Sequence, residues 1–365
     1  MPKVISLVGA RPQFVKEAMI YKEVRRLSAW DYVLVHSGQH YDAYMSGAFF
    51  DQLSIKNPDH SMDIGSGSHG AMTARALERF EAVLLKERPD MVLVYGDTNT
   101  TVAGALAASK LKIPVAHVEA GIRQNPKDMP EEINRVVTDH LSRHLFTCSR
   151  TAADNLAKEG ITQGVHNVGD VMYDLFLMMR SSFDGAITEK LGLKPNRFVL
   201  VTLHRDFNVD DERKLGEILK GLSELRKTLD LEIVFPAHPR TSKRIEEFGL
   251  SGLTDGIKIV PPVGYFQLMG LAENCALAVT DSGGFQKEAV FAGKRALVIM
   301  PDTGWRELTD CGWNLLAEPN SEDIVKKGLS IAQTDGTTPP TPYGDGHAAE
   351  KTVLALRSIL KGATQ

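Results

Sequence analysis

Cysteine is scarce in this chain, and its spacing excludes two common kinds of structural site. Cys148, Cys275 and Cys311 are the three cysteines, and they lie far apart without a CxxC spacing. Such a pattern is typical of reduced thiols in a core and not of a disulfide framework or a zinc site. We therefore expect neither disulfides nor bound zinc.

Long apolar runs and a dominant charge are also missing. No apolar stretch approaches the ~20 residues that a membrane-spanning helix needs, and no basic leader precedes an apolar run at the N-terminus. The net charge is only -4, so no global field attracts nucleic acid or anionic lipid. These absences predict a cytoplasmic protein that binds neither membranes nor nucleic acid.

The glycine pattern of dinucleotide-binding proteins is incomplete. The stretch Gly9-Ala10-Arg11-Pro12-Gln13 has the first glycine of G-x-G-x-x-G but lacks the second and third. We therefore expect no nicotinamide or flavin cofactor. Arg11 could instead bind a phosphate, helped by Lys16 one turn into the next helix. The alternative is that both are solvated cations near a helix start.

What the chain does contain is an alternation of short apolar runs and helical segments. With 365 residues and a hydrophobic fraction of 43%, two globular domains are the expectation. The alternation is typical of parallel sheets covered on both faces, and thus of the α/β class. In the first half we expect strands at 4–8, 32–36, 91–95, 115–118 and 145–147, and helices at 13–27, 70–87, 100–111 and 131–143.

The pattern restarts after a polar, turn-prone segment at 181–196, which we interpret as a linker. The second half predicts strands at 198–202, 233–236, 257–260, 277–280 and 296–299, helices at 211–228 and 264–273, and a last helix at 347–361 after a proline-rich break. We thus predict two doubly wound, Rossmann-like domains at 1–170 and 197–345. Ligands of such sheets collect beyond the carboxyl ends of the strands, so we expect the domains to face a cleft.

One strand of the second half breaks into a helix at Asp281-Ser282-Gly283-Gly284. Free N–H groups at a helix start and two missing Cβ atoms would form an anion cradle. The alternative is an ordinary turn that needs glycine for its dihedral angles. The tetrapeptide also resembles the nucleophile segment of chymotrypsin-like proteases, but its α/β surroundings and the lack of G-x-S-x-G exclude that interpretation. We interpret Ser282 as a phosphate ligand.

Two histidines have the spacing of metal ligands. His140 and His144 are four residues apart on a predicted helix, but Leu141 stands where H-E-x-x-H needs glutamate. We therefore favour histidines on a helix surface or between domains and expect no metal.

Carboxylates of the first half are the strongest candidates for chemistry. Asp97 and Glu119 follow strand ends, and Glu131 and Glu132 begin a helix. Paired carboxylates are what acid and base steps require. The alternative is that Asp97 caps the next helix and that the two glutamates stabilise a first helical turn.

A set of motifs, in order along nearly the whole chain, resembles the non-hydrolysing UDP-N-acetylglucosamine 2-epimerase family. The motifs are Gly9-Ala10-Arg11-Pro12, Gly96-Asp97-Thr98-Asn99-Thr100, His117-Val118-Glu119-Ala120-Gly121, Pro130-Glu131-Glu132-Ile133-Asn134-Arg135, Thr202-Leu203-His204-Arg205, residues 280–288 and Pro342-Tyr343-Gly344-Asp345-Gly346. The resemblance implies a glycosyltransferase-B-like fold, a homodimer, and reversible conversion of UDP-GlcNAc to UDP-ManNAc without a redox cofactor. It also implies that the last helix returns to the first domain.

The family mechanism eliminates UDP to give 2-acetamidoglucal and adds it back with the proton on the opposite face. The resemblance implies that Asp97, Glu119 and Glu131 are the acid and base set, and that Arg11, His204 and the Ser282-Gly283-Gly284 amides hold the diphosphate, which places His204 with the catalytic groups. Glu288 matches the position that holds the ribose. Further substrate-binding positions are matched by Lys16, Arg135, Arg205, His238 and Phe266.

Two departures from the family pattern concern the substrate. Phe207 and Gly304 stand where glutamate is common, and 38–42 and 63–67 look more like archaeal members or those acting on UDP-2,3-diacetamido-glucuronic acid. Such a sugar is the alternative substrate. A glycosyltransferase on the same scaffold and a catalytically silent UDP-sugar sensor are the alternative functions.

Overall fold

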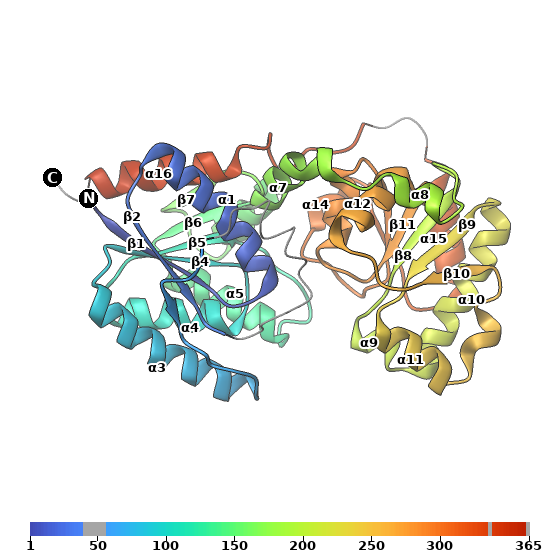
Figure 1. Cartoon of the computed structure of the whole chain (residues 1–365), viewed down its shortest axis with the longest axis horizontal. Coiled ribbons are helices and arrows are strands. Elements are labelled where there is room, and N and C mark those ends of the chain that lie inside the picture. The colour runs from blue at the N-terminus through green and yellow to red at the C-terminus, as the bar shows by residue number, and fades with distance from the viewer. Residues whose placement is uncertain (39–55, 335–337, 363–365) are drawn as a thin grey trace. The chain divides into compact units, whose positions relative to one another are not determined.

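The computed structural model describes residues 1–38, 56–334 and 338–362. The chain divides into two compact units. Unit 1 comprises Met1–Met178 and Thr341–Gln365, and unit 2 comprises Met179–Pro340. Each unit is a parallel sheet covered by helices, which confirms the predicted α/β class (Figure 1).

Among its described residues, unit 1 has a seven-stranded sheet in the order β3-β2-β1-β4-β5-β6-β7. Its strands are β1 (Lys3–Val8), β2 (Asp31–His36), β3 (His60–Ser61), β4 (Met91–Tyr95), β5 (Val115–Ala120), β6 (His144–Thr147) and β7 (Val165–Asn167). β4 is buried along its whole length, as expected for a strand that is covered on both faces. The strand order reverses between β1 and β4, which is where ligands of doubly wound sheets bind.

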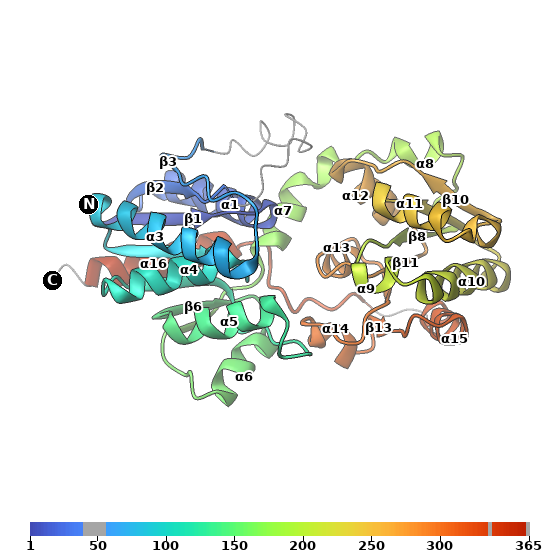
Figure 2. The same cartoon turned by 90° about the horizontal axis from the view of Figure 1, so that it is seen from below.

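Helices cover both faces of this sheet. They are α1 (Arg11–Leu27), α3 (His69–Glu87), α4 (Asn99–Lys110), α5 (Pro130–Leu141), α6 (Arg150–Lys158), α7 (Val171–Met179) and α16 (Ala348–Gly362). Figure 1 shows α3, α4 and α5 on one face and α1 and α16 on the other, and Figure 2 views unit 1 from the α3–α4–α5 face. α16 packs against α1, where Arg26 pairs with Glu350 at 2.6 Å.

Unit 2 has, in the part that the structure describes, a six-stranded sheet in the order β10-β9-β8-β11-β12-β13. The strands are β8 (Phe198–Thr202), β9 (Glu232–Pro236), β10 (Ile257–Val260), β11 (Leu277–Thr280), β12 (Ala296–Val298) and β13 (Leu315–Leu316). The helices are α8 (Ala186–Lys190), α9 (Asp206–Val209), α10 (Glu212–Leu229), α11 (Pro239–Glu247), α12 (Tyr265–Asn274), α13 (Phe285–Phe291), α14 (Arg306–Asp310) and α15 (Ser321–Ala332). Its core joins strand residues such as Val201 and Phe235 to the apolar stripe of α10.

The segment at 181–196 is not the linker that its polar sequence indicated. The boundary between the units lies at 178/179, and α8, inside the segment, packs against α12. The Asp184 N–H also donates to the Phe266 carbonyl at 3.0 Å. The segment is polar because it lies at the surface of unit 2, and backbone hydrogen bonds hold it there.

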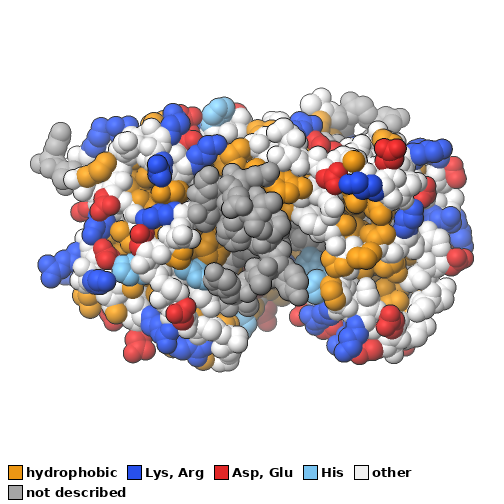
Figure 3. Space-filling model, viewed as in Figure 1, with side chains coloured by type: hydrophobic (Ala, Val, Ile, Leu, Met, Phe, Trp, Pro, Cys, Tyr) orange, Lys and Arg blue, Asp and Glu red, His pale blue; other side chains and the backbone are white. Residues whose placement is uncertain are grey.

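Charge is distributed as the small net charge predicts. On the face seen in Figure 3, lysine and arginine side chains are intermixed with acidic ones over both units. No helix in the described ranges is long and apolar enough to cross a membrane.

Candidate active site

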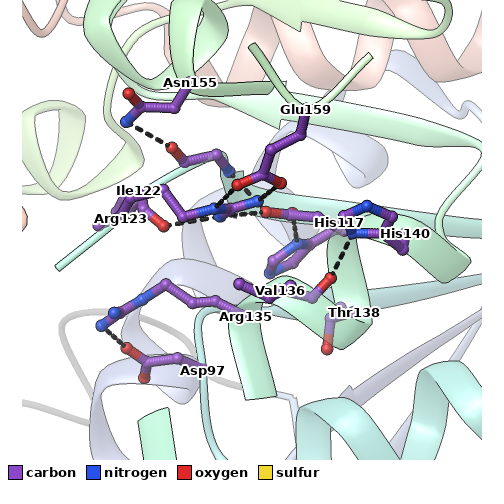
Figure 4. Close-up of polar contacts among 12 residues, drawn as sticks. Asp97, His117, Ile122, Arg123, Arg135, Val136, Thr138, His140, Asn155 and Glu159 are labelled. Atoms are coloured by element: carbon purple, nitrogen blue, oxygen red, sulfur yellow. Dashed lines mark hydrogen bonds and ion pairs between the residues drawn. The ribbon is translucent and has the colours of Figure 1, made fainter. Parts of the chain in front are cut away.

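Asp97 follows β4 and Gly96, in a turn that leaves its side chain partly exposed. Gly96 has a φ of +60°, which favours glycine. Thr98, not Asp97, caps α4, because its side chain accepts the Thr101 N–H. The interpretation of Asp97 as a cap is therefore wrong. Its carboxylate instead pairs with Arg135 at 2.6 Å and remains 32% exposed, so it can meet a ligand (Figure 4).

Glu119 lies in an irregularity of β5. The pairing of β5 with β6 shifts register between Val118 and Ala120, so Glu119 is the extra residue of a bulge, and its φ is +72°. Bulges re-aim side chains next to active sites, and a positive φ costs a residue other than glycine ~1–3 kcal/mol. The strained backbone turns the Glu119 carboxylate to Lys16, at 2.6 Å, with both side chains nearly buried. An ammonium so close favours the ionised carboxylate.

Gln13 holds the ends of β1 and β4 together, and sequence reasoning missed it. Its Oε1 accepts the N–H groups of Gly9 and Ala10. Its Nε2 donates to the Tyr95 carbonyl at 2.7 Å and to Thr101 at 2.8 Å. Gln13 is buried. Loss of any of these hydrogen bonds would therefore leave a buried polar group without a partner, which costs free energy. The Gly9-Ala10 turn and the Asp97 turn are thereby coupled.

The start of α5 supplies Glu131, Glu132 and Arg135. Glu132 is buried, bonds the Gln124 N–H at 3.0 Å and pairs with Arg135, whereas Glu131 is only half-buried. Burial lowers the pKa of Arg135, but the charges of Asp97 and Glu132 outweigh it and raise that pKa above its ordinary value. Arg135 therefore stays cationic and contacts Asp97 directly, the carboxylate with which it was predicted to share a site.

A small pocket opens beside the Lys16–Glu119 pair, within unit 1. Phe146 and Cys148 of the β6 end form its apolar side, and Asp170 stands before α7. The complete lining is Lys16, Val118, Glu119, Phe146, Cys148, Val168, Gly169, Asp170 and Val171. The recess thus brings the Lys16–Glu119 pair up to an apolar wall.

In unit 2, Asp281 organises the turn that carries His204 and Arg205. The Asp281 carboxylate is fully buried and accepts the N–H groups of His204 and Arg205 at 3.0 Å each. Asn208 donates to it at 3.2 Å. Burial lowers the pKa of His204, against the opposing charge of Asp281. Sequence reasoning used Asp281 only to weigh a protease; its position at the end of a buried strand could have identified it.

Gly283 and Gly284 do not adopt backbone dihedral angles that require glycine. Gly284, the N-cap of α13, has a φ of -76°, and Gly283 is not among the residues with positive φ. A Cβ added to Gly284 would meet no atom within 4 Å, and one added to Gly283 only an Arg205 nitrogen, at 3.8 Å. The interpretation as a turn that needs glycine for its dihedrals is therefore wrong. The missing Cβ atoms leave room for a ligand.

Trp305 contacts the turn that contains Gly283 and Gly284, and sequence reasoning missed this residue. Its Nε1 donates to the Gly283 carbonyl at 2.7 Å, and its ring lies under the Lys287 ammonium, 3.6 Å from the ring centroid. Ser282 Oγ accepts the Phe285 N–H. The Arg205 Nε, by contrast, is buried and has no hydrogen-bond partner among the described residues. A buried donor without a partner is costly unless a ligand satisfies it.

The remaining predicted residues lie around these clusters or outside the described part. His238 caps α11, with Nδ1 accepting the Arg240 N–H at 3.2 Å, and its side chain is exposed. Phe266 is on α12 and Glu288 on α13, each half-buried. Arg11 begins α1, but its side chain lies outside what the structure describes, as do residues 39–42 of the segment 38–42 that was compared with archaeal members.

His140 and His144 do not share a helix, contrary to the prediction. α5 ends at Leu141, Ser142 is extended, and His144 is the first residue of β6, where its ring lies 6.1 Å from that of His166. The four-residue spacing therefore does not place the two imidazoles on one face of a helix. Within the described ranges, no group of three or more His, Cys, Asp or Glu side chains could hold a metal ion.

Comparison with known proteins gives one consistent match over the whole chain. Residues 22–357 match the family described as UDP-N-acetylglucosamine 2-epimerase. A Methanococcus maripaludis protein, a UDP-N-acetylglucosamine 2-epimerase homolog, is 44% identical over 98% of this chain and 100% of its own length. The UDP-2,3-diacetamido-2,3-dideoxy-D-glucuronate 2-epimerase of Pseudomonas aeruginosa is 43% identical with the same coverage.

Among solved structures, the Methanocaldococcus jannaschii UDP-GlcNAc 2-epimerase in complex with UDP-GlcNAc and UDP has a TM-score of 0.85 and 38% identity. The alignment covers 98% of this chain and 100% of that one. The two sheets of this chain therefore belong to the glycosyltransferase-B-like architecture of these structures.

Proposed function

Because this chain belongs to the UDP-N-acetylglucosamine 2-epimerase family, and is therefore a UDP-sugar 2-epimerase, we propose that it interconverts UDP-N-acetylglucosamine and UDP-N-acetylmannosamine. The observation that carries the proposal is the pair of neighbouring strand ends in unit 1, which present Asp97 beside Arg135 and Glu119 beside Lys16. Two carboxylates held in different environments are what acid and base steps require.

The chemistry of the sugar explains why carboxylates and a diphosphate site are both needed. The C2 hydrogen does not lie next to a carbonyl, so its direct removal would be very slow. Breaking the C1–oxygen bond to the diphosphate makes C1 electron-deficient and C2 acidic. A base takes the C2 proton, the C–H electrons form the C1–C2 double bond, and UDP leaves with the C–O electrons. Addition of UDP to the resulting 2-acetamidoglucal, with protonation from the opposite face, inverts C2.

We assign the proton transfers to Asp97, Glu119 and Glu131. Lys16 pairs with Glu119 at 2.6 Å, and Arg135 pairs with Asp97 at 2.6 Å, so each carboxylate has a cation as its direct neighbour. Glu131 lies one helical turn before Arg135 and is half-buried. A positioned acid or base contributes ~10²–10⁴-fold to the rate.

We assign the grip on the leaving diphosphate to unit 2 and to Arg11. The open space at Gly283 and Gly284 and the unpaired Arg205 Nε support a phosphate ligand there. His204, whose pKa burial lowers, is placed beside this turn by Asp281. Glu288, on the helix that follows, would bind the ribose. One preorganised donor to a developing negative charge is typically worth ~10²–10³-fold.

A second substrate is favoured by a specific observation. The Pseudomonas aeruginosa relative, named for UDP-2,3-diacetamido-2,3-dideoxy-D-glucuronate, is 43% identical. That value is close to the 39% of the Methanococcus maripaludis UDP-N-acetylglucosamine 2-epimerase. The alternative substrate is therefore the diacetamido uronic acid, which differs at C3 and C6 but offers the same C1 and C2 to the reaction.

Incubation in D₂O tests both substrates. The protein is incubated separately with UDP-N-acetylglucosamine and with the diacetamido uronate, and ¹H NMR follows C2. Deuterium is expected at C2 of substrate and product for one of them. Loss of deuterium incorporation with both would contradict the proposal. UDP release that requires an added acceptor would indicate a glycosyltransferase, and binding by calorimetry without turnover would indicate a sensor.

We further propose that the chain forms a homodimer, as the family resemblance implies. Light scattering coupled to size-exclusion chromatography should give about twice the monomer mass of 40.1 kDa. A monomer mass over the whole concentration range would contradict this.

A further inference from the structure

His117 occupies a buried position between the two strand ends that carry Asp97 and Glu119. The residue lies on β5, and its side chain is fully buried. Its Nδ1 is 2.7 Å from Asp139 Oδ1, and its Nε2 is 2.8 Å from the Gly96 carbonyl oxygen. Figure 4 shows the His117 ring near the Arg123–Glu159 pair.

Each ring nitrogen thus faces an oxygen that accepts hydrogen bonds. A carbonyl oxygen can only accept, so Nε2 must carry a hydrogen. An ionised carboxylate also only accepts, so Nδ1 must carry a second one unless Asp139 is protonated. The geometry therefore leaves two states: an imidazolium with a carboxylate, or a neutral imidazole with a carboxylic acid.

The surroundings of Asp139 decide between these states. Its Oδ2 accepts the Gly121 N–H at 3.1 Å and an Arg123 N–H at 2.7 Å, so all its contacts are donors to a carboxylate. Burial raises the pKa of Asp139, but hydrogen bonds and charges from His117 and Arg123 outweigh it and lower that pKa below its ordinary value. Asp139 is therefore the ionised member, and His117 carries both protons.

The charges of this group are balanced by pairing, from buried Asp139 out to Glu159 at the surface. Arg123 pairs with Glu159 as well as Asp139, through two nitrogens on the two Glu159 oxygens. His117 and Arg123 thus face Asp139 and Glu159, two cations with two anions. A buried ion pair survives when its remaining hydrogen-bonding groups are satisfied, and here they are.

The pair is tied to two backbone positions that bracket the candidate catalytic carboxylates. The Gly96 carbonyl belongs to the peptide that leads into Asp97, and the Gly121 N–H lies two residues after Glu119. Gly96 has a φ of +60° and Gly121 of +82°, on either side of the bulge at Glu119. A Cβ at Gly121 would lie 2.3 Å from the Ala152 carbonyl oxygen, so this turn has no room to relax.

We propose that His117 and Asp139 are positioning residues: a His117 ring that donates from both nitrogens, to the Asp139 carboxylate and to the Gly96 carbonyl, holds the Gly96 and Gly121 peptides and so sets the directions of Asp97 and Glu119. The inference rests on the proposed function only for its kinetic consequence. The protonation state itself is a property of the folded chain. Neither residue contacts the reacting sugar in this scheme, so neither is catalytic.

Neutron diffraction from crystals of the wild-type protein grown in D₂O tests the protonation state. We expect deuterons on both Nδ1 and Nε2 of His117 and none on Asp139. One deuteron on the ring, or one on Asp139, would overturn the proposal. This experiment uses the wild-type protein without substrate. Its result therefore depends neither on the folding of a variant nor on which reaction the protein catalyses.

Asp139→Asn tests the consequence, with Thr138→Val as the control. The side-chain amide that replaces the Asp139 carboxylate has the same shape. Its NH₂ group, however, must face either the His117 ring N–H or the N–H groups of Gly121 and Arg123, which are all donors. Thr138 is the neighbouring buried residue on α5, and its hydroxyl has no hydrogen-bond partner in the described part of the chain. Its replacement changes the same helix without touching the pair.

For Asp139→Asn we expect kcat for C2 exchange to fall on the order of 10²-fold with KM nearly unchanged, because small misplacements of reacting groups have this effect. Thr138→Val should retain wild-type kcat. A folded Asp139→Asn protein with wild-type kcat would overturn the proposal, as would an equal loss in both variants. If the variant does not fold, the neutron result decides. Absence of exchange in the wild type would defeat the proposed function and leave the protonation result intact.

Discussion

Replacement of Glu17 by glutamine should make the stability of this protein less dependent on pH. Glu17 lies on α1 and is fully buried. Its Oε1 accepts the Tyr32 hydroxyl at 2.6 Å, whereas Oε2 has no hydrogen-bond partner among the described residues. Burial raises the pKa of Glu17 to about 7, although the Tyr32 hydrogen bond and the Lys56 charge lower it. The folded protein therefore holds this proton much more tightly than the unfolded chain does.

The magnitude follows from the shift between the folded and unfolded states. The pKa rises from 4.5 to about 7, and each unit corresponds to ~1.4 kcal/mol, so ionisation of Glu17 costs the folded state about 3 kcal/mol. The stabilising effect of the proton is fully present below pH 4.5 and is lost as pH rises through 7. The free energy of unfolding should thus decrease by about 3 kcal/mol through this group between pH 5 and pH 8.

Urea denaturation of wild type and Glu17→Gln at several pH values from 5 to 8.5 measures this term. Glutamine cannot ionise, so the difference in unfolding free energy between the two proteins should shift by about 3 kcal/mol over the range in favour of the variant. Any cost of fitting the amide into the site does not depend on pH, so it cancels in the comparison. Glu78→Gln, at an exposed position on α3, is the control. Parallel pH profiles for wild type and Glu17→Gln would refute the reasoning.

Three further outcomes follow from the two candidate clusters. Asp97→Asn should lower C2 exchange in D₂O by ~10²–10⁴-fold with UDP affinity within a few fold; normal turnover would remove Asp97 from the mechanism. Gly284→Ala should weaken UDP binding in calorimetry without lowering the melting temperature, because the added methyl meets no protein atom within 4 Å; unchanged affinity would place the ligand elsewhere. Asp281→Asn should lower the unfolding free energy by about 1–3 kcal/mol, because one of the two acceptor oxygens is replaced by an NH₂ group that faces the N–H donors of His204, Arg205 or Asn208; an unchanged denaturation midpoint would contradict this.

Much of the fold could be predicted because parallel strands buried on both faces leave a strong local signal. The run at 91–95 is apolar throughout, the run at 277–280 is apolar up to its final Thr280, and both are strands in the structure. Three short strands, β3, β7 and β13, were not predicted. Each has only two or three residues, which is too few to show a hydrophobic alternation. The helix predicted through 143 ends at Leu141, because Ser142 turns extended to feed β6, and no local residue signals that change.

The candidate site was predictable only in part, for a related reason. Strand-end polar residues such as Asp97 and Glu119 can be read from position, since the ends of parallel strands meet at one edge. Their partners come from far along the chain: Lys16 is 103 residues from Glu119, and Arg135 is 38 from Asp97. The bulge at Glu119 and the burial of His117 against Asp139 depend on packing between elements, which periodicity does not encode.

The return of α16 to unit 1 has a consequence for how the protein is made. α16 buries Val353, Leu356 and Leu360 and packs on α1, yet it is synthesised only after all of unit 2. A nascent chain that has completed 1–178 must keep part of α1 uncovered while all of 179–340 is synthesised. Unit 2 is continuous in sequence and can fold in that interval, whereas unit 1 can be completed only after α16 has been synthesised. Excision of 179–340 with a short connection in its place is therefore the way to obtain unit 1 by itself, and a simple truncation after 178 is not.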